Sequence, residues 1–366
     1  MRHRERIQTA LSHRAPDRCP MFASFTPEFA VRLREALGRS PGAHHNPHGG
    51  GNTYQLERDL DFDMLLTSVG WANGYYANEA YAPGQSSYTD EWGVTWKNVA
   101  YSTRFGDGFY TEMVGCPLAE DARIAGYRAP DADRPELYTS SERTIMDFGG
   151  EYWIVGATVT TIFETAWALR GYERLLTDFL TDADLADAVL DIPFRYHLRA
   201  AERLVRMGVD MIWIGDDVGG QASMIMAPET WRRFLKPLMA KFISTLKAIN
   251  PALKVAYHSD GWFFPIIPEL IEVGVDVLNP IQTRSMDPAR LKKDFGERLC
   301  FWGSIDEQHT LPFGTPADVR AEVATRLSTL GRGGGLILAP SQHVQLDTPV
   351  ENFLAMVEAV KETPCS

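Results

Sequence analysis

The stretch "KVAYHSDGWFFPIIPELIEVGVDVLNPIQ" (residues 254–282) contains two short apolar runs, at 254–260 and 275–282, separated by a longer helical pattern. Near-continuous apolar runs are typical of parallel strands that are buried on both faces. Working outward from this stretch, six further runs of the same kind follow the same alternation, at residues 18–25, 63–69, 153–159, 210–217, 299–306 and 336–342. Eight strands with helices between them predict a (β/α)8 barrel of the TIM type.

Sequence signals for helix starts support the prediction that helices follow these strands. Asp287–Pro288, Thr315–Pro316 and Thr348–Pro349 each place a capping side chain before a proline at the predicted first helical position. The alternative fold is an open, doubly wound sheet. No G-x-G-x-x-G motif follows the first apolar run, which disfavours that alternative.

Two segments interrupt the alternation. Residues 71–115 are rich in Tyr, Trp and Gly, and predict a short antiparallel insertion between the second and third strands that covers an active site as a lid. Residues 42–52, "GAHHNPHGGGN", contain three histidines; we interpret them as a mobile surface loop, with metal binding as the alternative. No linker or internal repeat is evident, so a single barrel domain is expected over residues 1–366.

Charge and composition restrict the possible partners. The formal net charge of −12 disfavours a nucleic-acid partner, because binding to phosphates needs a basic surface. The four cysteines are far apart and form no C-x-x-C motif, which is typical of reduced thiols. No apolar run approaches the roughly 20 residues that span a bilayer, so we expect a cytoplasmic protein without a membrane partner. The oligomeric state is left open.

Polar residues end the predicted strands, or come shortly after them, on the side where barrels of this type carry their active sites. They are Glu164 and Trp167, Asp216 and Asp217, His258 and Asp260, Asn279 and Gln282, Ser304 and Asp306, and Gln342 and His343. His258 and Asp260 are two residues apart, so on an extended chain their side chains point to the same side. The C-terminal rim is therefore the predicted site.

Two kinds of chemistry fit these residues. Asp217, His258 and Asp260 are the candidate catalytic groups, and they can act as acids and bases without a metal. Alternatively, His258, Asp260 and His343 offer three ligands to a Zn²⁺ ion and leave a fourth position open. The candidate substrate-binding residues are Glu164, Trp167, Asp216, Trp262, Gln282, Asp306 and Gln342. Purely structural roles are the alternatives. Asp306 and one of Asp216 and Asp217 would cap the helix that follows their strand, and Glu164 would form an ion pair with Arg170.

A family resemblance covers nearly the whole chain. Its motifs are "RERIQTALSHRAPDRCPMF" (4–22), "DEWGVTWK" (90–97), "ALRGYERLL" (168–176), "GDDVGGQASMIMAPETWRRFLKP" (215–237), "HSDGWFFPIIPELIEVGVDVLNPIQ" (258–282) and "GLILAPSQHVQLDTPVENFLAMVEAV" (335–360). With these motifs the chain resembles the uroporphyrinogen decarboxylase superfamily, which includes corrinoid-linked methyltransferases. The resemblance also implies a (β/α)8 barrel.

Within that superfamily, the resemblance is closer to the methyltransferase branch. The decarboxylases share an Arg-bearing "RQAGRY"-like stretch, whereas this chain reads "ASFTPEFAVRL" at residues 23–33. The methyltransferases share a His-x-Cys and a distant Cys that bind zinc. Here His258 matches the histidine, Asp260 stands in place of the first cysteine, and Gln342 stands in place of the second. This set of ligands is harder than a thiolate set, so an oxygen- or nitrogen-bound methyl donor and metal-free chemistry both stay open.

The resemblance implies a methyltransferase that moves a methyl group between a small methoxy- or methylamine-type compound and a corrinoid. The corrinoid would be carried on a separate protein, and Zn²⁺ would be the metal. One alternative is a decarboxylase-like lyase that acts on a carboxylated substrate through Asp and His. Another is a non-catalytic protein that binds a ligand.

Overall fold

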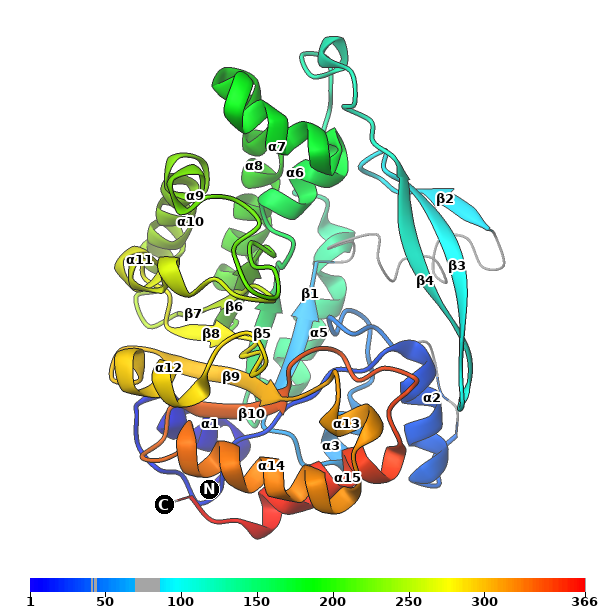
Figure 1. Cartoon of the computed structure of the whole chain (residues 1–366), viewed down its shortest axis with the longest axis vertical. Coiled ribbons are helices and arrows are strands. Elements are labelled where there is room, and N and C mark those ends of the chain that lie inside the picture. The colour runs from blue at the N-terminus through cyan, green and yellow to red at the C-terminus, as the bar shows by residue number, and fades with distance from the viewer. Residues whose placement is uncertain (41, 43–44, 70–85, 366) are drawn as a thin grey trace.

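The computed structural model describes residues 1–40, 42, 45–69 and 86–365. Seven parallel strands form one sheet that curls into the wall of a barrel, with helices around it (Figure 1). In sheet order they are β1 (Met64–Ser68), β5 (Trp153–Ala157), β6 (Met211–Gly215), β7 (Lys254–His258), β8 (Val277–Asn279), β9 (Cys300–Ile305) and β10 (Leu336–Pro340). Seven of the eight predicted strands are therefore regular.

The eighth position of the barrel is filled by the first apolar run, residues 18–25. It is not a continuous strand, but it pairs in parallel with the β10 side through Met21 with Leu338 and Phe25 with Val344. On its other side, the Asp63 N–H donates to the Met21 carbonyl oxygen at 3.1 Å, next to β1. Pro20 has no N–H to donate, which limits regular pairing here. The TIM-type barrel is confirmed, with one irregular strand position.

Helices surround the sheet and bury its outer face. They are α1 (His3–Leu11), α2 (Pro27–Ala36), α3 (Gln55–Asp59), α5 (Thr139–Phe148), α6 (Phe163–Arg170), α7 (Tyr172–Thr181), α8 (Ala183–Met207), α9 (Pro228–Phe234), α10 (Lys236–Ile249), α11 (Ile267–Val273), α12 (Pro288–Phe295), α13 (Thr310–Phe313), α14 (Pro316–Thr329) and α15 (Val350–Glu362). Three short 3-10 helices are η1 (Asp121–Arg123), η2 (Pro135–Tyr138) and η3 (Phe264–Ile266). Within the described ranges, no helix is both long enough and apolar enough to cross a membrane.

Two of the three predicted helix caps are present. The Asp287 side chain accepts the Ala289 N–H, and the Thr315 side chain accepts the Asp318 N–H. The third prediction is wrong by one residue, because α15 begins at Val350 with Pro349 in the cap position. The Thr348 side chain is buried and donates to Glu307 at 3.4 Å instead of capping the helix.

The core has an inner and an outer part. Alternate residues of the strands form a cluster inside the barrel that includes Met64, Trp153, Trp213 and Trp302. The other residues of the strands pack outward against the helices. Because both faces are covered, all residues of most of the barrel strands are buried, and this explains the continuous apolar runs in the sequence.

The predicted antiparallel insertion is confirmed. Strands β2 (Ser87–Thr89), β3 (Thr95–Thr103) and β4 (Gly106–Gly115) form a separate three-stranded sheet between β1 and β5 in the sequence (Figure 1). The end of the β3–β4 hairpin reaches the barrel, where Arg104 donates to the Pro312 carbonyl oxygen at 2.9 Å. Residues 71–85 of the predicted lid lie outside the described part of the chain, and the lid function stays a prediction.

Candidate active site

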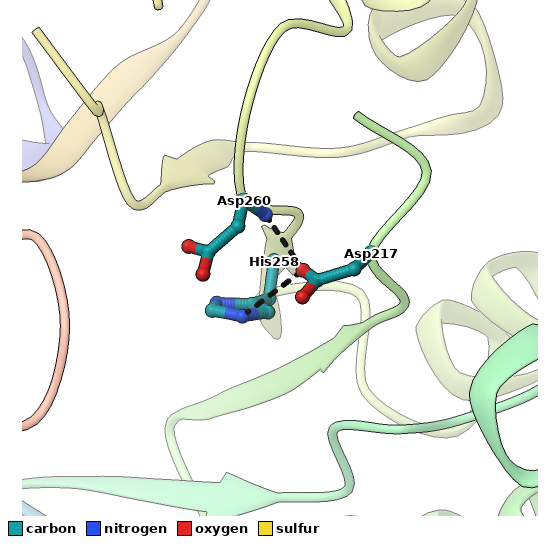
Figure 2. Close-up of side chains that lie close together, drawn as sticks. All are labelled: Asp217, His258 and Asp260. Atoms are coloured by element: carbon teal, nitrogen blue, oxygen red, sulfur yellow. Dashed lines mark hydrogen bonds and ion pairs between the residues drawn. The ribbon is translucent and has the colours of Figure 1, made fainter. Parts of the chain in front are cut away.

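The C-terminal ends of β6 and β7 and the residues just after them meet at the C-terminal end of the barrel. Asp217, His258 and Asp260 each offer one ligand atom, and these atoms all lie within 4.8 Å of one another (Figure 2). Asp217 Oδ1 is 3.6 Å from His258 Nε2 and accepts the Asp260 backbone N–H at 2.7 Å. The three predicted catalytic residues therefore lie together, and we call them the acid–imidazole group.

Close approach of two strand ends makes this possible. Gly215 pairs with His258 in the sheet and has a φ of +141°. A Cβ atom at Gly215 would lie 2.1 Å from the His258 carbonyl oxygen, so only glycine fits without a shift of the backbone. This glycine lets the chain after β6 pass next to the end of β7, and it brings Asp217 to His258.

Asn279, at the end of β8, determines which nitrogen of His258 carries the hydrogen. The Asn279 amide nitrogen donates to the Trp302 carbonyl oxygen at 3.3 Å, so its amide oxygen is the atom that lies 2.8 Å from His258 Nδ1. Because that oxygen only accepts, Nδ1 must donate, and in a neutral ring Nε2 then holds a lone pair. This lone pair faces the Asp217 carboxylate, an arrangement that needs a proton or a cation between the two atoms.

Asp260 is oriented by Gln342. The Gln342 amide oxygen accepts the His343 N–H at 2.9 Å, which turns the amide nitrogen toward Asp260 Oδ2 at 3.1 Å. The other oxygen, Asp260 Oδ1, is buried and has no hydrogen-bond partner among the residues described. Burial, together with the nearby Asp217 charge, raises the pKa of Asp260 to about 6.

Two further acids lie behind this group. Asp216 accepts the backbone N–H groups of Ile162 and Glu164 and so caps the start of α6. The structural alternative placed such a cap on the helix that follows the strand, whereas α6 precedes β6 in the chain. The Glu164 carboxylate accepts the Asp217 N–H at 3.1 Å. Burial raises the pKa of Asp216 to about 6. Burial and the Asp217 charge raise the pKa of Glu164 well above its usual range.

The predicted ion pair between Glu164 and Arg170 is wrong. Arg170 lies at the opposite end of α6 and instead pairs with Asp178 at 2.7 Å and with Asp121 at 2.6 Å. Over residues 1–40, 42, 45–69 and 86–365, no Lys or Arg pairs with Glu164, Asp216, Asp217 or Asp260. The site therefore gathers four acidic side chains without a basic Lys or Arg partner in the described part of the chain, and their burial, together with their proximity to one another, raises the pKa of Glu164, Asp216 and Asp260.

A small pocket that opens to solvent lies beside the acid–imidazole group. The aromatic residues in its wall are Phe22, Trp213 and Trp302, and its polar residues are Ser24, His258, Asn279, Ser341, Gln342 and His343. The two predicted imidazoles thus share one pocket. His343 Nδ1 lies 2.6 Å from the Ser24 hydroxyl. Among the described residues, Asp217 and not His343 completes the group of three around His258 and Asp260.

Six of the seven predicted substrate-binding residues are absent from the lining of this pocket: Glu164, Trp167, Asp216, Trp262, Gln282 and Asp306. The seventh, Gln342, lines it. Gln282 accepts the Gly261 N–H at 2.7 Å and so holds the loop after β7. Asp306 accepts the N–H groups of Gln308 and His309 in a local turn. Trp167 and Trp262 pack against the outer core. A direct substrate contact for these six residues stays a prediction.

The sequence-based interpretation missed a histidine that lies beside the pocket wall. His48 is only 7% exposed, and its ring centroid lies 5.3 Å from that of His343 and 6.1 Å from that of Trp213. His45, 3% exposed, packs against Phe25. The prediction of a mobile surface loop at residues 42–52 is therefore wrong for its described part. The three consecutive glycines at 49–51 could have indicated that this segment packs closely against the barrel, because glycine allows close backbone approach and positive φ.

Comparison with known proteins identifies the family. The family model "Uroporphyrinogen decarboxylase (URO-D)" matches residues 113–363, well over half of the chain. This chain belongs to the uroporphyrinogen decarboxylase family. URO-D family members are enzymes, and the relatives of this one include methyltransferases.

Two curated relatives and one solved structure illustrate the relationship of this URO-D family member. The methylcobamide:CoM methyltransferase MtaA of Methanosarcina barkeri is 30% identical over 179 residues, which is 49% of each chain. A uroporphyrinogen decarboxylase of Legionella pneumophila is 25% identical over 224 residues, 60% of this chain and 59% of the relative. The chain thus aligns with about half the length of the curated relatives that it matches. A methyltransferase from Methanosarcina mazei shares the fold, with a TM-score of 0.66, 21% identity and 99% coverage of both chains.

Proposed function

We propose that this protein is a methyltransferase that moves a methyl group between a small methylated compound and a corrinoid carried on a separate protein. We also propose that the acid–imidazole group holds a divalent cation, with Zn²⁺ as the first candidate. The observation that carries the metal proposal is the His258 Nε2 atom, which faces Asp217 Oδ1 at 3.6 Å with its hydrogen placed on the other ring nitrogen. The similarity to methyltransferases supports the reaction.

The residues present fit a divalent cation. One imidazole nitrogen and two carboxylate oxygens form a three-ligand set that leaves a position open for substrate, as in catalytic zinc sites. The buried Asp260 Oδ1 has no hydrogen-bond partner in the described chain, so it is the oxygen available as a ligand. A cation here would polarise the heteroatom that gains or loses the methyl group.

The surrounding residues would orient these ligands. Asn279 holds His258 through Nδ1, and Gln342 holds Asp260 through Oδ2. Hydrogen bonds of this kind usually fix the ring orientation and raise the basicity of metal ligands. Glu164 accepts the Asp217 N–H and so fixes the backbone at the third ligand. Gln342 thus has a defined positioning role where the methyltransferases that the chain resembles have a cysteine.

The chemistry of the ligands favours one class of substrate. Oxygen and nitrogen ligands are harder than thiolates and suit oxygen- or nitrogen-bound methyl groups. The aromatic wall formed by Phe22, Trp213 and Trp302 offers an apolar surface to the rest of a methoxy- or methylamine-type compound. In the metal-free alternative, a proton on His258 would take the place of the cation.

The described site disfavours uroporphyrinogen decarboxylation. No Lys or Arg is among the lining residues of the pocket, and four acids lie beside or behind it. A tetrapyrrole with many carboxylates would bring unpaired negative charge into this environment, at a cost of several kcal/mol for each buried ion. We therefore expect no coproporphyrinogen in a turnover assay with uroporphyrinogen, and its appearance would support the lyase alternative.

Two measurements test the proposal. The first is elemental analysis of protein purified without chelator, followed by calorimetric titration with Zn²⁺. The second is a single-turnover assay with cob(I)alamin and a panel of methoxy and methylamine compounds, followed by cobalt absorbance. We expect His258→Ala to reduce the rate by about 10²-fold or more, as loss of a general acid–base group typically does.

The matched control is His309→Ala, because His309 is exposed and lies outside the pocket lining. It should leave both metal binding and the rate unchanged. Absence of Zn²⁺ binding with methyl transfer intact would reject the metal and keep the reaction. Absence of cobalt methylation across the whole panel would reject the reaction itself.

A further inference from the structure

We propose that His48 is a positioning residue for the acid–imidazole group. Its ring would hold Trp213 and His343 in place and, through them, keep His258 and Asp260 facing a common point. The inference uses the same site as the proposed function, and it rests on that function only for the metal-binding readout. No residue of the glycine-rich segment 42–52 has a role in the chemistry proposed above.

The backbone of residues 46–52 is held in one arrangement. Asn46 and Asn52 bond reciprocally: the Asn46 N–H donates to Asn52 Oδ1 at 2.8 Å, and Asn52 Nδ2 donates to the Asn46 carbonyl oxygen at 2.8 Å. The His48 N–H then donates to Asn46 Oδ1 at 2.9 Å. These bonds close a compact turn that fixes the backbone from which the His48 side chain extends.

Contact with the barrel then fixes this turn against β1. Gly49 has a φ of +85°, and a Cβ atom there would lie 1.8 Å from the Leu66 carbonyl oxygen. The Tyr54 hydroxyl lies 3.0 Å from the Gly49 carbonyl oxygen and 2.7 Å from the Leu66 carbonyl oxygen, both of which are acceptors. Because β1 belongs to the barrel wall, His48 is held relative to the barrel and not only relative to its own loop.

The His48 ring contacts two rings of the pocket wall. It meets His343 edge to face, at 5.3 Å between centroids and 84° between planes, and it lies tilted against Trp213 at 6.1 Å. Trp213 in turn meets His258 edge to face at 5.4 Å. His48 is therefore linked to the His258 imidazole through Trp213.

His48 is also linked to Asp260, through His343 and Gln342. The His343 side chain bonds to Ser24, and its backbone N–H donates to the Gln342 amide oxygen, which turns the Gln342 amide nitrogen toward Asp260 Oδ2. Displacement of the His343 ring would disturb this orientation. A single side chain thus supports both His258, through Trp213, and Asp260, through His343 and Gln342.

The charge state of His48 is compatible with this position. Burial, and to a lesser extent the nearby His258, lower the pKa of His48 to about 4, so the ring is neutral at physiological pH. A neutral ring fills the space next to the pocket without repelling a cation at the acid–imidazole group. An aromatic ring of similar size should therefore replace it, whereas a small side chain should not.

The test compares three variants of the full chain. His48→Ala removes the ring, His48→Phe keeps an aromatic ring without ring nitrogens, and His309→Ala is the exposed control. We expect His48→Ala to weaken Zn²⁺ affinity by about 10- to 100-fold, the usual effect of losing a supporting partner of a metal ligand. His48→Phe should restore most of that affinity. The visible spectrum of the Co²⁺-loaded protein should change in His48→Ala only.

A metal-independent readout separates this inference from the proposed function. In protein labelled with fluorotryptophan, the ¹⁹F signal of Trp213, assigned with Trp213→Phe, should shift and broaden in His48→Ala and stay near its original position in His48→Phe. If the wild-type protein binds no metal, the Trp213 signal still decides the inference. An unchanged signal in His48→Ala, or a His48→Phe variant as strongly affected as His48→Ala, would overturn it.

Discussion

Glu57 offers a pH-dependent stability test that is independent of the site. It lies on α3 and is only 5% exposed. Burial raises its pKa from 4.5 to about 7, and the Arg34 charge offsets this only in part. The carboxyl therefore stays protonated in the folded protein at pH values at which it ionises in the unfolded chain.

The direction in which stability changes with pH follows from whether Glu57 keeps its proton in the folded and in the unfolded state. As pH rises above about 4.5, the unfolded chain releases the Glu57 proton while the folded protein keeps it, so the free energy of unfolding falls. The fall ends near pH 7, where the folded protein also releases the proton. The difference between the two pKa values corresponds to about 3 kcal/mol of stability lost by pH 8.

Replacing Glu57 with Gln removes the ionisation and keeps the shape of the side chain. We expect Glu57→Gln to be more stable than the wild-type protein by up to about 3 kcal/mol at pH 8, and by little at pH 5. Urea unfolding at pH 5, 6, 7 and 8 measures the difference, and Glu136→Gln, at an exposed position, is the control. Parallel stability curves for the variant and the wild type, or a variant less stable at pH 8, would show that Glu57 is ionised and paired in the folded protein.

Two substitutions test the structure around the barrel. Asp63→Asn removes a fully buried carboxylate that pairs with Arg6 at 2.5 Å and Arg18 at 2.6 Å, so we expect chemical denaturation to show a loss of about 3–5 kcal/mol. A loss below about 1 kcal/mol would contradict the assigned role of this network, since breaking a buried ion pair typically costs more. Gly215→Ala would place a Cβ 2.1 Å from the His258 carbonyl oxygen, and we expect it to reduce Zn²⁺ affinity about tenfold or more while circular dichroism shows the fold retained. Unchanged affinity would show that the two strand ends can separate without disturbing the acid–imidazole group.

Much of the site could be predicted from the sequence because the barrel fold constrains where strand ends lie. Apolar runs mark strands that are buried on both faces, and in a parallel barrel all their C-terminal ends meet at one rim. Asp217, His258 and Asp260 lie at the ends of such runs, so the fold and the alternation of side chains along a strand predict that they lie at the same rim. The resemblance to the methyltransferases then singled out His258.

Tertiary structure alone decided which residues complete the group. Asp216 and Asp217 are adjacent, yet one caps α6 and the other faces His258, and this depends on the pairing of Gly215 with His258. His48 reaches the pocket wall because Gly49 packs against Leu66, which lies 17 residues further along the chain. Periodicity in a sequence reports local backbone geometry. Such contacts depend instead on how distant segments pack, and no local pattern in the sequence encodes that packing.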